Sequence, residues 1–93
     1  MPHTAAKLMV EGRVQGVGYR WWTVERAREF GLSGWVRNRP DRSVEILAIG
    51  DEAGIQRLFD ACREGPAGAV VRAVRLEAAE DDGSDGFRQK ATG

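Results

Sequence analysis

The sequence predicts an α+β fold in which two helices cover one face of an antiparallel sheet. Short runs of alternating apolar and polar residues predict strands, and two longer runs carry apolar residues at helical spacing. Glycine or proline separates most of these runs from one another. Because 93 residues suffice for one modest hydrophobic core, we expect a single domain over residues 1–93.

The first half of the chain predicts a strand, a helix and a second strand. After a loose start at residues 1–6, apolar and polar residues alternate over residues 7–14. Residues 19–30 contain neither Gly nor Pro and place apolar side chains three or four positions apart, so we expect a helix there. Gly31 suits a left-handed helix cap, and the alternation resumes over residues 32–38.

The next part predicts a hairpin and a second helix. Residues 39–42 place Pro and Asp where a turn prefers them, and residues 44–49 form the antiparallel partner strand. The second helix opens at Gly50-Asp51-Glu52, with acidic residues in its first turn as the helix dipole favours. It carries an apolar stripe and ends at Gly65-Pro66.

The last part completes the order βαββαβ. Residues 69–78 predict the fourth strand, whose apolar residues change side, so that a bulge can occur. Residues 87–92 can add a short edge strand after an acidic loop. This order is that of the ferredoxin-like, split βαβ architecture. Right-handed crossovers place the first and third strands in the middle, and Asn38 then lies near the turn that follows the first strand.

A glycine-bearing turn between the first strand and the first helix predicts an anion site. Gly16 and Gly18 can adopt positive φ, so that successive backbone N–H groups converge on one anion. The helix start adds unpaired N–H groups and partial positive charge, and Arg20 adds a planar fork of donors. We expect a phosphate there. The alternative is an ordinary tight turn followed by a solvated arginine.

The known nucleotide signatures do not fit this turn. A Walker A motif needs Lys followed by Ser or Thr after its second glycine, and neither is present. Gly12, Gly16 and Gly18 do not have the dinucleotide-binding spacing. With Cys62 as the only cysteine and His3 as the only histidine, we expect no metal site, no cofactor and no Cys–His catalytic pair.

Two further features have a structural interpretation. Cys62 lies on the apolar stripe of the second helix with Ile55 and Leu58, so we expect a core residue rather than a nucleophile. Trp21 and Trp22 are adjacent and cannot both face the core. One of them is exposed near the turn, where it covers the sheet edge or walls a pocket; we favour the covering role.

The charge pattern limits the classes of partner. The formal net charge is zero, which argues against bulk electrostatic capture of nucleic acid or a membrane surface. Residues 1–46 hold eight Lys or Arg against five Asp or Glu, so the half with the glycine turn is positive. No run approaches the ~18 apolar residues of a membrane helix, and the start lacks a secretion-signal pattern. We expect a cytoplasmic monomer with a small anionic substrate.

Two motifs resemble the signature of the acylphosphatase family. They are the segment Gly12–Arg20 and the segment Gly34-Trp35-Val36-Arg37-Asn38, within a resemblance that spans residues 7–76. It implies a ferredoxin-like fold and an enzyme that hydrolyses acyl phosphates, the mixed anhydrides of carboxylic and phosphoric acids. The residues that it implies for holding the phosphate are Gln15, Gly16, Val17, Gly18, Tyr19 and Arg20. It further implies that Arg20 is catalytic and that Asn38 holds the attacking water.

This chemistry agrees with the anion site found from the residues. An acyl phosphate has a good leaving group, so an enzyme need only hold the phosphate, stabilise charge in the transition state and orient a water. No metal or covalent nucleophile is required. Asn38 has no basic group at neutral pH and can only orient the water through its amide. We hypothesise that the water's proton passes to a phosphate oxygen of the substrate.

The sequence departs from the family pattern at two positions. Asp41-Arg42 stands where the family often has Asp-Gly, so a residue with a side chain occupies a position that favours positive φ. Tyr19 stands where Phe is common, and its hydroxyl needs a hydrogen-bond partner if it is buried.

The same fold also carries other functions. A non-catalytic anion-binding or regulatory module has no need of Asn38 beside Arg20. An RNA-binding domain of this fold usually has aromatic residues on its central strands, and residues 7–14 and 44–49 have none. A similar module begins larger carbamoyl-transfer maturation proteins, but a free-standing protein is the simpler interpretation.

Overall fold

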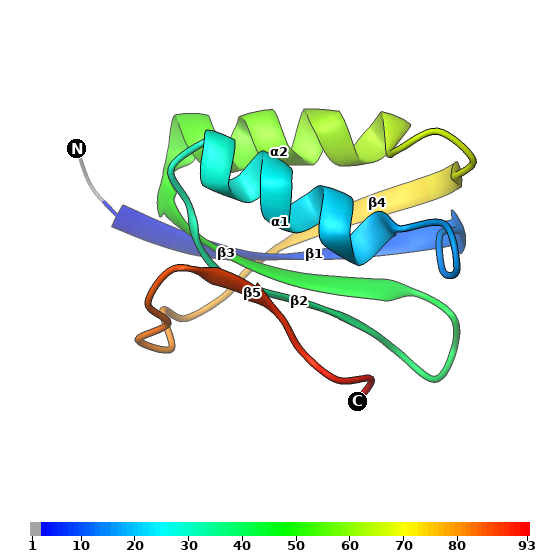
Figure 1. Ribbon diagram of the computed structural model, residues 1–93. Coiled ribbons are helices and arrows are strands. Elements are labelled where there is room, and N and C mark those ends of the chain that lie inside the picture. Colours follow the sequence, from blue (N-terminus) through cyan, green and yellow to red (C-terminus); the bar gives the residue numbers. More distant parts are fainter. Residues whose placement is uncertain (1–2) are drawn as a thin grey trace.

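A computed structural model describes residues 3–93, which form two helices and five strands (Figure 1). Their order along the chain is β1 (His3–Arg13), α1 (Tyr19–Glu29), β2 (Ser33–Asn38), β3 (Val44–Asp51), α2 (Glu52–Glu64), β4 (Val70–Ala78) and β5 (Phe87–Gln89). The predicted βαββαβ order is confirmed. The suggested edge strand near the end of the chain is present in a shorter form.

The first strand starts earlier than predicted. Residues 3–6 are not a loose start, because Thr4 pairs with Gly50 and Ala6 pairs with Ala48 of β3. Alanine has little β propensity, so this part of the sequence carries no strand signal by itself. Pairing with the central strand supplies what the local sequence lacks. Met1 and Pro2, the rest of the expected loose start, lie outside the described residues.

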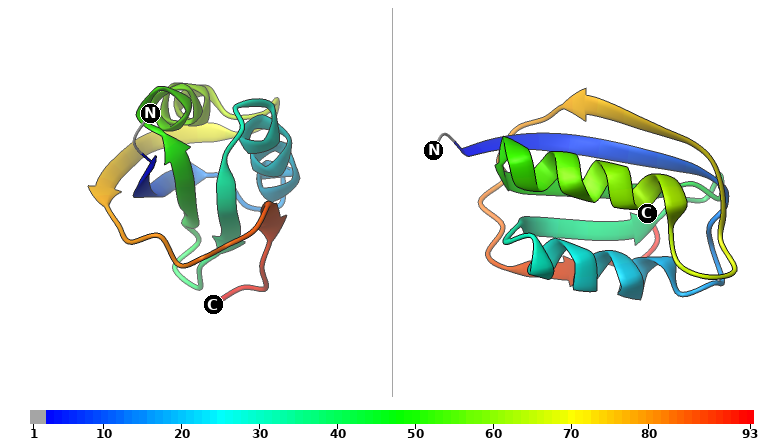
Figure 2. Two further views of the ribbon diagram at one scale, coloured as in Figure 1. Left: turned by 90° about the vertical axis from the view of Figure 1, so that its left-hand side faces the viewer. Right: turned by 90° about the horizontal axis from the view of Figure 1, so that it is seen from above.

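The strand order is β4-β1-β3-β2-β5, with β1 and β3 in the middle as the crossover rule predicts. Neighbouring strands run antiparallel except β2 and β5, which are parallel. The sheet is therefore mixed, and the expectation of a wholly antiparallel sheet holds for four strands only. The fifth strand is parallel because the chain crosses the face opposite the helices before it reaches the outer side of β2 (Figure 2).

The predicted bulge in the fourth strand lies at the end of β1 that leads into the glycine turn. Glu11 pairs with Ala73, whereas Gly12 pairs with Val71, so Arg72 is an extra residue in β4. A side chain on Gly12 would collide with the backbone carbonyl of Val70. The bulge and the glycine therefore belong together and fix how β1 enters the turn.

Both helices lie on one face of the sheet, side by side (Figures 1 and 2). They enclose a hydrophobic core with the strands, and Cys62 is buried in it as predicted. Prominent core residues are Leu8, Val10, Tyr19, Ala27, Val36, Ile46, Leu58 and Cys62. Within residues 3–93, no helix is long and apolar enough to cross a membrane.

Gly31 ends α1 as predicted. Its φ is 72°, its N–H donates to the carbonyl of Arg28, and the N–H of Leu32 donates to the carbonyl of Ala27. These two bonds satisfy carbonyls that the helix end would otherwise leave free. The cap turns the chain directly into β2, the strand that carries Asn38.

The other face of the sheet carries a smaller core, formed by Ala5, Trp35, Leu47 and Ile49. The loop between β4 and β5 crosses it, and Trp35 Nε1 donates to Asp82 Oδ2 at 3.0 Å. The cationic groups of Arg37 and Lys90 lie 5.0 and 4.4 Å from the Trp35 ring centroid. The hydrogen bond to Asp82 ties the acidic loop to a face that the helices leave uncovered.

Glu45 is a carboxylate that this face buries, with 5% of the residue exposed. Its oxygens lie 3.2 Å from Lys7 Nζ, 2.7 Å from Arg37 Nε and 3.4 Å from Arg39 Nη1. Burial alone would raise the pKa of Glu45, but hydrogen bonds and charges from Arg37 and Lys7 outweigh it and hold the pKa below its usual 4.5. The ionised carboxylate thus links β1, β2 and β3.

We expect Glu45→Gln to lower the free energy of unfolding at pH 7 by about 1–3 kcal/mol, because the ion pairs are lost and their cations are only partly exposed. A lowered pKa stabilises the fold above the unfolded-state value and loses this effect as pH falls through the folded-state value. The difference between wild type and variant should therefore shrink below about pH 4.5.

Urea unfolding at pH 7 and pH 3 measures this difference. Glu25→Gln is the matched control, because Glu25 is exposed in the middle of α1, and we expect a change within about 0.5 kcal/mol. A Glu45→Gln effect of the same size at both pH values would contradict the proposed ionic contribution.

Candidate active site

A small hollow lies where the β1–α1 loop, the end of β2 and the edge strand β5 meet. Its volume is about 140 Å³. The residues that line it are Val14, Gly16, Gly18, Tyr19, Arg20, Trp21, Asn38 and Gln89. The two motifs that the sequence pointed to are therefore brought together at one place, although α1 and its cap separate them along the chain.

The β1–α1 loop presents backbone donors to this hollow. Gly16 has φ 75° and Gly18 has φ 79°, both in the left-handed region. A Cβ atom on either residue would meet nothing within 4 Å, so the torsion angle and not the available space favours glycine. Within residues 3–93, no group accepts a hydrogen bond from the backbone N–H groups of Gly16 to Trp21. These donors are free for an anion.

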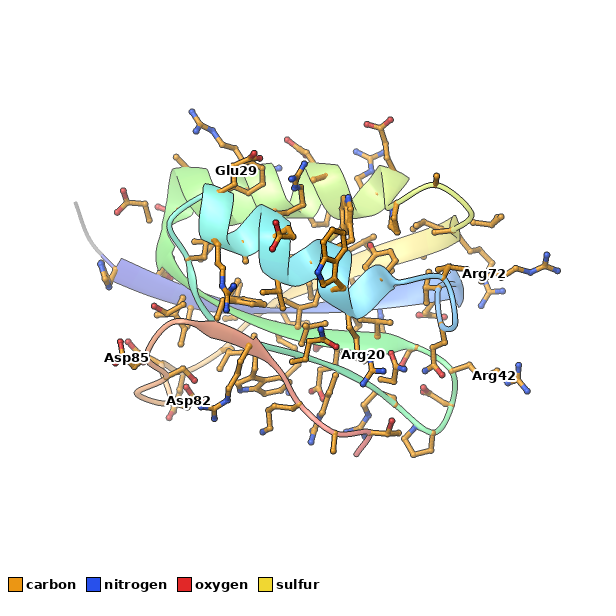
Figure 3. All side chains as sticks on the ribbon, viewed as in Figure 1. Arg20, Glu29, Arg42, Arg72, Asp82 and Asp85 are labelled. Carbon is orange, nitrogen blue, oxygen red and sulfur yellow. The ribbon has the colours of Figure 1, made fainter. Side chains whose placement is uncertain are left out.

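Arg20 adds a full positive charge at the start of α1. It is the second residue of the helix, partly exposed, and Figure 3 shows its side chain extending from the first turn towards the sheet. It forms no ion pair with any residue between 3 and 93. The free guanidinium and the positive end of the helix dipole therefore act in the same place.

Asn38 lies at the end of β2, where the strand leaves the sheet. The strand register places it opposite Val44 of β3, and its backbone carbonyl accepts a hydrogen bond from the Gly93 N–H at 3.1 Å. The backbone on both sides of the residue is thus fixed. Asn38 is one of the residues that line the hollow, and an asparagine amide is a neutral donor and acceptor.

The side chain of Gln15 ties the glycine loop to the β2–β3 turn. Its Nε2 donates to the carbonyls of Arg39 and Ser43, both at 2.9 Å. Two bonds from one amide fix the position of the loop relative to the residues that follow Asn38. Gln15 itself does not line the hollow, so its side chain acts on the loop position.

Tyr19 and Val17 direct their side chains to the core. The Tyr19 hydroxyl donates to the Cys62 carbonyl at 2.7 Å, which is the partner that the sequence required for a buried tyrosine. Burial, and next the neighbouring Cys62, raise the pKa of Tyr19 far above its usual value. Tyr19 is therefore neutral and is no proton donor or acceptor for chemistry in the hollow. Val17 packs against the same core.

Two lining residues were missed or given another role from sequence. Gln89 comes from β5, and a short polar edge strand carries no motif that would mark it. Trp21 is 63% exposed, while Trp22 packs on Tyr19 with ring centroids 5.3 Å apart. One exposed tryptophan was expected. Of the two roles that the sequence left open, Trp21 has that of a pocket wall.

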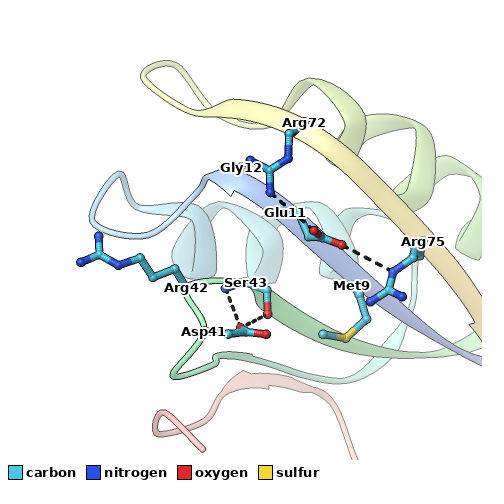
Figure 4. A pocket seen from close by; sticks show the side chains of 8 residues that line it. All are labelled: Met9, Glu11, Gly12, Asp41, Arg42, Ser43, Arg72 and Arg75. Carbon is cyan, nitrogen blue, oxygen red and sulfur yellow. Dashed lines mark hydrogen bonds and ion pairs between the residues drawn. The ribbon is translucent and has the colours of Figure 1, made fainter.

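A wider hollow of about 420 Å³ lies on the face opposite the helices, between β1, β4 and the β2–β3 turn (Figure 4). The charged side chains of this wider hollow include two carboxylates that already have hydrogen-bond or ion-pair partners. Glu11 lies 3.5 Å from Arg72 Nη2 and 3.6 Å from Arg75 Nε, and Asp41 accepts hydrogen bonds from the backbone N–H and hydroxyl of Ser43. No residue of a helix lines it. The smaller hollow is therefore the better candidate for an anion.

Known proteins resemble this chain over nearly its whole length. A sequence model of the family described as acylphosphatase matches residues 6–89. A protein of Acidiphilium cryptum named acylphosphatase is 47% identical over 89 residues, which cover 96% of this chain and 98% of that protein. Among solved structures, an acylphosphatase from Coxiella burnetii superimposes with a TM-score of 0.91 at 34% identity, covering 95% of this chain and 93% of its own. An acylphosphatase from Bacillus subtilis gives 0.88 at 36% identity, with coverages of 92% and 97%.

The β2–β3 turn contains a strained residue. Arg42 has φ 76°, the left-handed conformation that the sequence suggested for this position. A non-glycine residue in the left-handed conformation costs roughly 1–2 kcal/mol, which a glycine at this position avoids. Glycine also makes the unfolded chain more flexible, and this offsets about 0.5–1 kcal/mol of the stabilisation. We expect Arg42→Gly to raise the free energy of unfolding by about 0.5–1 kcal/mol, measured by urea unfolding.

Arg42→Ala is the matched control, because it removes the guanidinium but keeps a side chain at positive φ. It should not stabilise the fold. If Arg42→Ala stabilised as much as Arg42→Gly, the charge of Arg42 and not its backbone conformation would be responsible.

Proposed function

The chain belongs to the acylphosphatase family, and from this premise we propose how its residues carry out the reaction. The activity is that of an acylphosphatase, a hydrolase that converts an acyl phosphate into a carboxylate and inorganic phosphate. In our proposal, the backbone of residues 15–20 and the guanidinium of Arg20 hold the phosphate, and the amide of Asn38 orients the water. The support is that Gly16, Gly18 and Tyr19 of this segment, Arg20 and Asn38 all line one hollow.

The phosphate carries the charge that this site is built to hold. The N–H groups from Gly16 to Trp21 have no hydrogen-bond partner, and Arg20 no ion-pair partner, within residues 3–93, so they can bind an anion without first breaking contacts there. A preorganised donor to charge that develops in the transition state contributes about 2.7–4 kcal/mol. A few such donors therefore supply a large part of the catalysis without an acid–base pair.

The proposed step is an in-line displacement at phosphorus. The water oxygen that Asn38 orients forms a bond to phosphorus, and the bond from phosphorus to the acyl oxygen breaks with its electron pair. The carboxylate leaves, and the water's proton passes to an oxygen of the phosphoryl group. The products from the dianionic acyl phosphate are one carboxylate and one dihydrogen phosphate ion, H2PO4−, so atoms and charge balance. Arg20 stabilises the charge on the equatorial oxygens throughout.

The residues that line the hollow contain no carboxylate, thiol or histidine. Their one ionisable group besides Arg20 is the Tyr19 hydroxyl, whose pKa burial raises strongly. His3 lies at the start of β1, at the opposite end of that strand from the loop. Among the groups at this hollow, a phosphoryl oxygen of the substrate itself is thus the nearest proton acceptor for the attacking water.

We also propose that one copy of the chain suffices in the cytoplasm. Arg20 and Asn38, to which we assign the catalytic roles, both line this hollow within one fold, and the only cysteine in the sequence is free and buried. A cytosolic protein has no need of disulfides.

We expect Arg20→Ala to lower kcat/KM for benzoyl phosphate by about 10²–10³, and to weaken inhibition by inorganic phosphate at least tenfold, because a charged donor is lost.

Asn38→Ala should lower kcat by a similar factor and leave phosphate inhibition within about twofold, because its amide contacts the water. Release of inorganic phosphate measures both.

Arg13→Ala is the control for loss of charge, because Arg13 lies at the end of β1 just before the loop but does not line the hollow. We expect it to retain activity. Equal effects of the Arg13 and Arg20 substitutions would mean that general charge, not contact with the phosphate, drives binding. Background phosphate release by wild type and all variants would refute the residue roles.

The pH dependence tests the proton transfer separately. With no enzymic base in the hollow, kcat should show no enzyme-derived ionisation between about pH 5 and 8. Rates at saturating benzoyl phosphate across this range provide the measurement, with circular dichroism to verify folding at each pH. A bell-shaped profile that one carboxylate substitution abolishes would refute transfer to the substrate.

A further inference from the structure

The hollow is too small to enclose a whole substrate. Its volume of about 140 Å³ lies well below the roughly 300–1,000 Å³ of pockets that enclose drug-sized ligands. If the phosphate sits on the loop as proposed above, on which this inference rests, the acyl group must lie at the mouth. The side chains at the mouth then decide which acyl groups bind well.

Trp21 is the large apolar side chain at this mouth. It directly follows Arg20 in the first turn of α1, and consecutive helical residues point about 100° apart. The charged and the aromatic side chain therefore border the same hollow from neighbouring directions.

The exposure of Trp21 has no structural explanation in the fold. It is 63% exposed, whereas Trp22 packs on Tyr19 and the core. The indole N–H of Trp21 donates to no acceptor within residues 3–93, and no aromatic or cationic side chain of that range stacks on it. Its ring face is thus open to solvent and available to a ligand.

We propose that Trp21 is a platform for the acyl group and gives this site a preference for aromatic acyl phosphates. The loop and Arg20 bind the dianionic end of such a substrate, while the indole face covers its flat apolar end. Aromatic rings favour offset-stacked or edge-to-face contact with indole. An acetyl group is too small to cover much of the indole face. The platform therefore distinguishes acyl groups by the apolar area that each one buries against Trp21.

Turnover of two substrates tests the platform. We expect Trp21→Ala to lower kcat/KM for benzoyl phosphate about tenfold, mostly through KM, and to change kcat/KM for acetyl phosphate less than twofold. Trp21→Phe should keep most of the preference, because an aromatic face remains. Leu76→Ala is the control: Leu76 is 46% exposed but lies on β4 outside the hollow, and both substrates should be unaffected.

Binding of stable analogues separates this inference from the proposed residue roles, since it needs no turnover. Calorimetry should show wild type binding phenylphosphonate about tenfold more tightly than methylphosphonate, and Trp21→Ala binding the two alike. Inorganic phosphate should bind both proteins equally. If the Trp21→Ala protein keeps the wild-type ratios for substrates and analogues, the platform is refuted even though the phosphate site stands. If phosphonates bind but Arg20→Ala is fully active, the residue roles fail instead.

Discussion

The pairing of the two central strands is the constraint on which the site depends. β1 and β3 are antiparallel, with Val10 opposite Val44, and Asn38 of β2 lies opposite the same Val44. This register sets the end of β1, the start of β3 and the end of β2 in one row across the sheet. The glycine loop and Asn38 therefore meet because of strand pairing. A slip of one residue would turn every side chain of a strand to the other face, and the core residues on alternate positions prevent it.

On this sheet, the candidate site consists largely of backbone groups. Backbone N–H groups of the β1–α1 loop that have no partner within residues 3–93 lie beside the hollow, and two nearby side chains set where this backbone lies. Gln15 holds the loop to the turn, and Tyr19 anchors the start of α1 to α2 through the Cys62 carbonyl. Arg20 of the first motif and Asn38 of the second are both among the residues that line the hollow. A small domain can thus present several aligned donors with few charged residues.

Local patterns predicted most of this arrangement. Alternation and helical spacing gave the six main elements, and the glycines with Arg20 indicated an anion site before any family was considered. What the sequence did not reveal depends on contacts between distant segments. Residues 3–6 are a strand only because β3 pairs with them, and β5 runs parallel only because of the path of the loop before it. Gln89 reaches the site through that same path, so no local signal marks it. The role of Gln15 needed the position of two carbonyls in the turn.

The two loop glycines impose a limit of handedness rather than of size. Because the space beside Gly16 and Gly18 is empty, what excludes an ordinary alanine there is the sign of φ. A mirror-image residue prefers that sign, so a D-alanine introduced by chemical synthesis matches the φ angle of both positions and reduces the freedom of the unfolded loop. The backbone conformation of the β1–α1 loop is therefore compatible with a stiffer chain than any genetically encoded residue provides at these two positions.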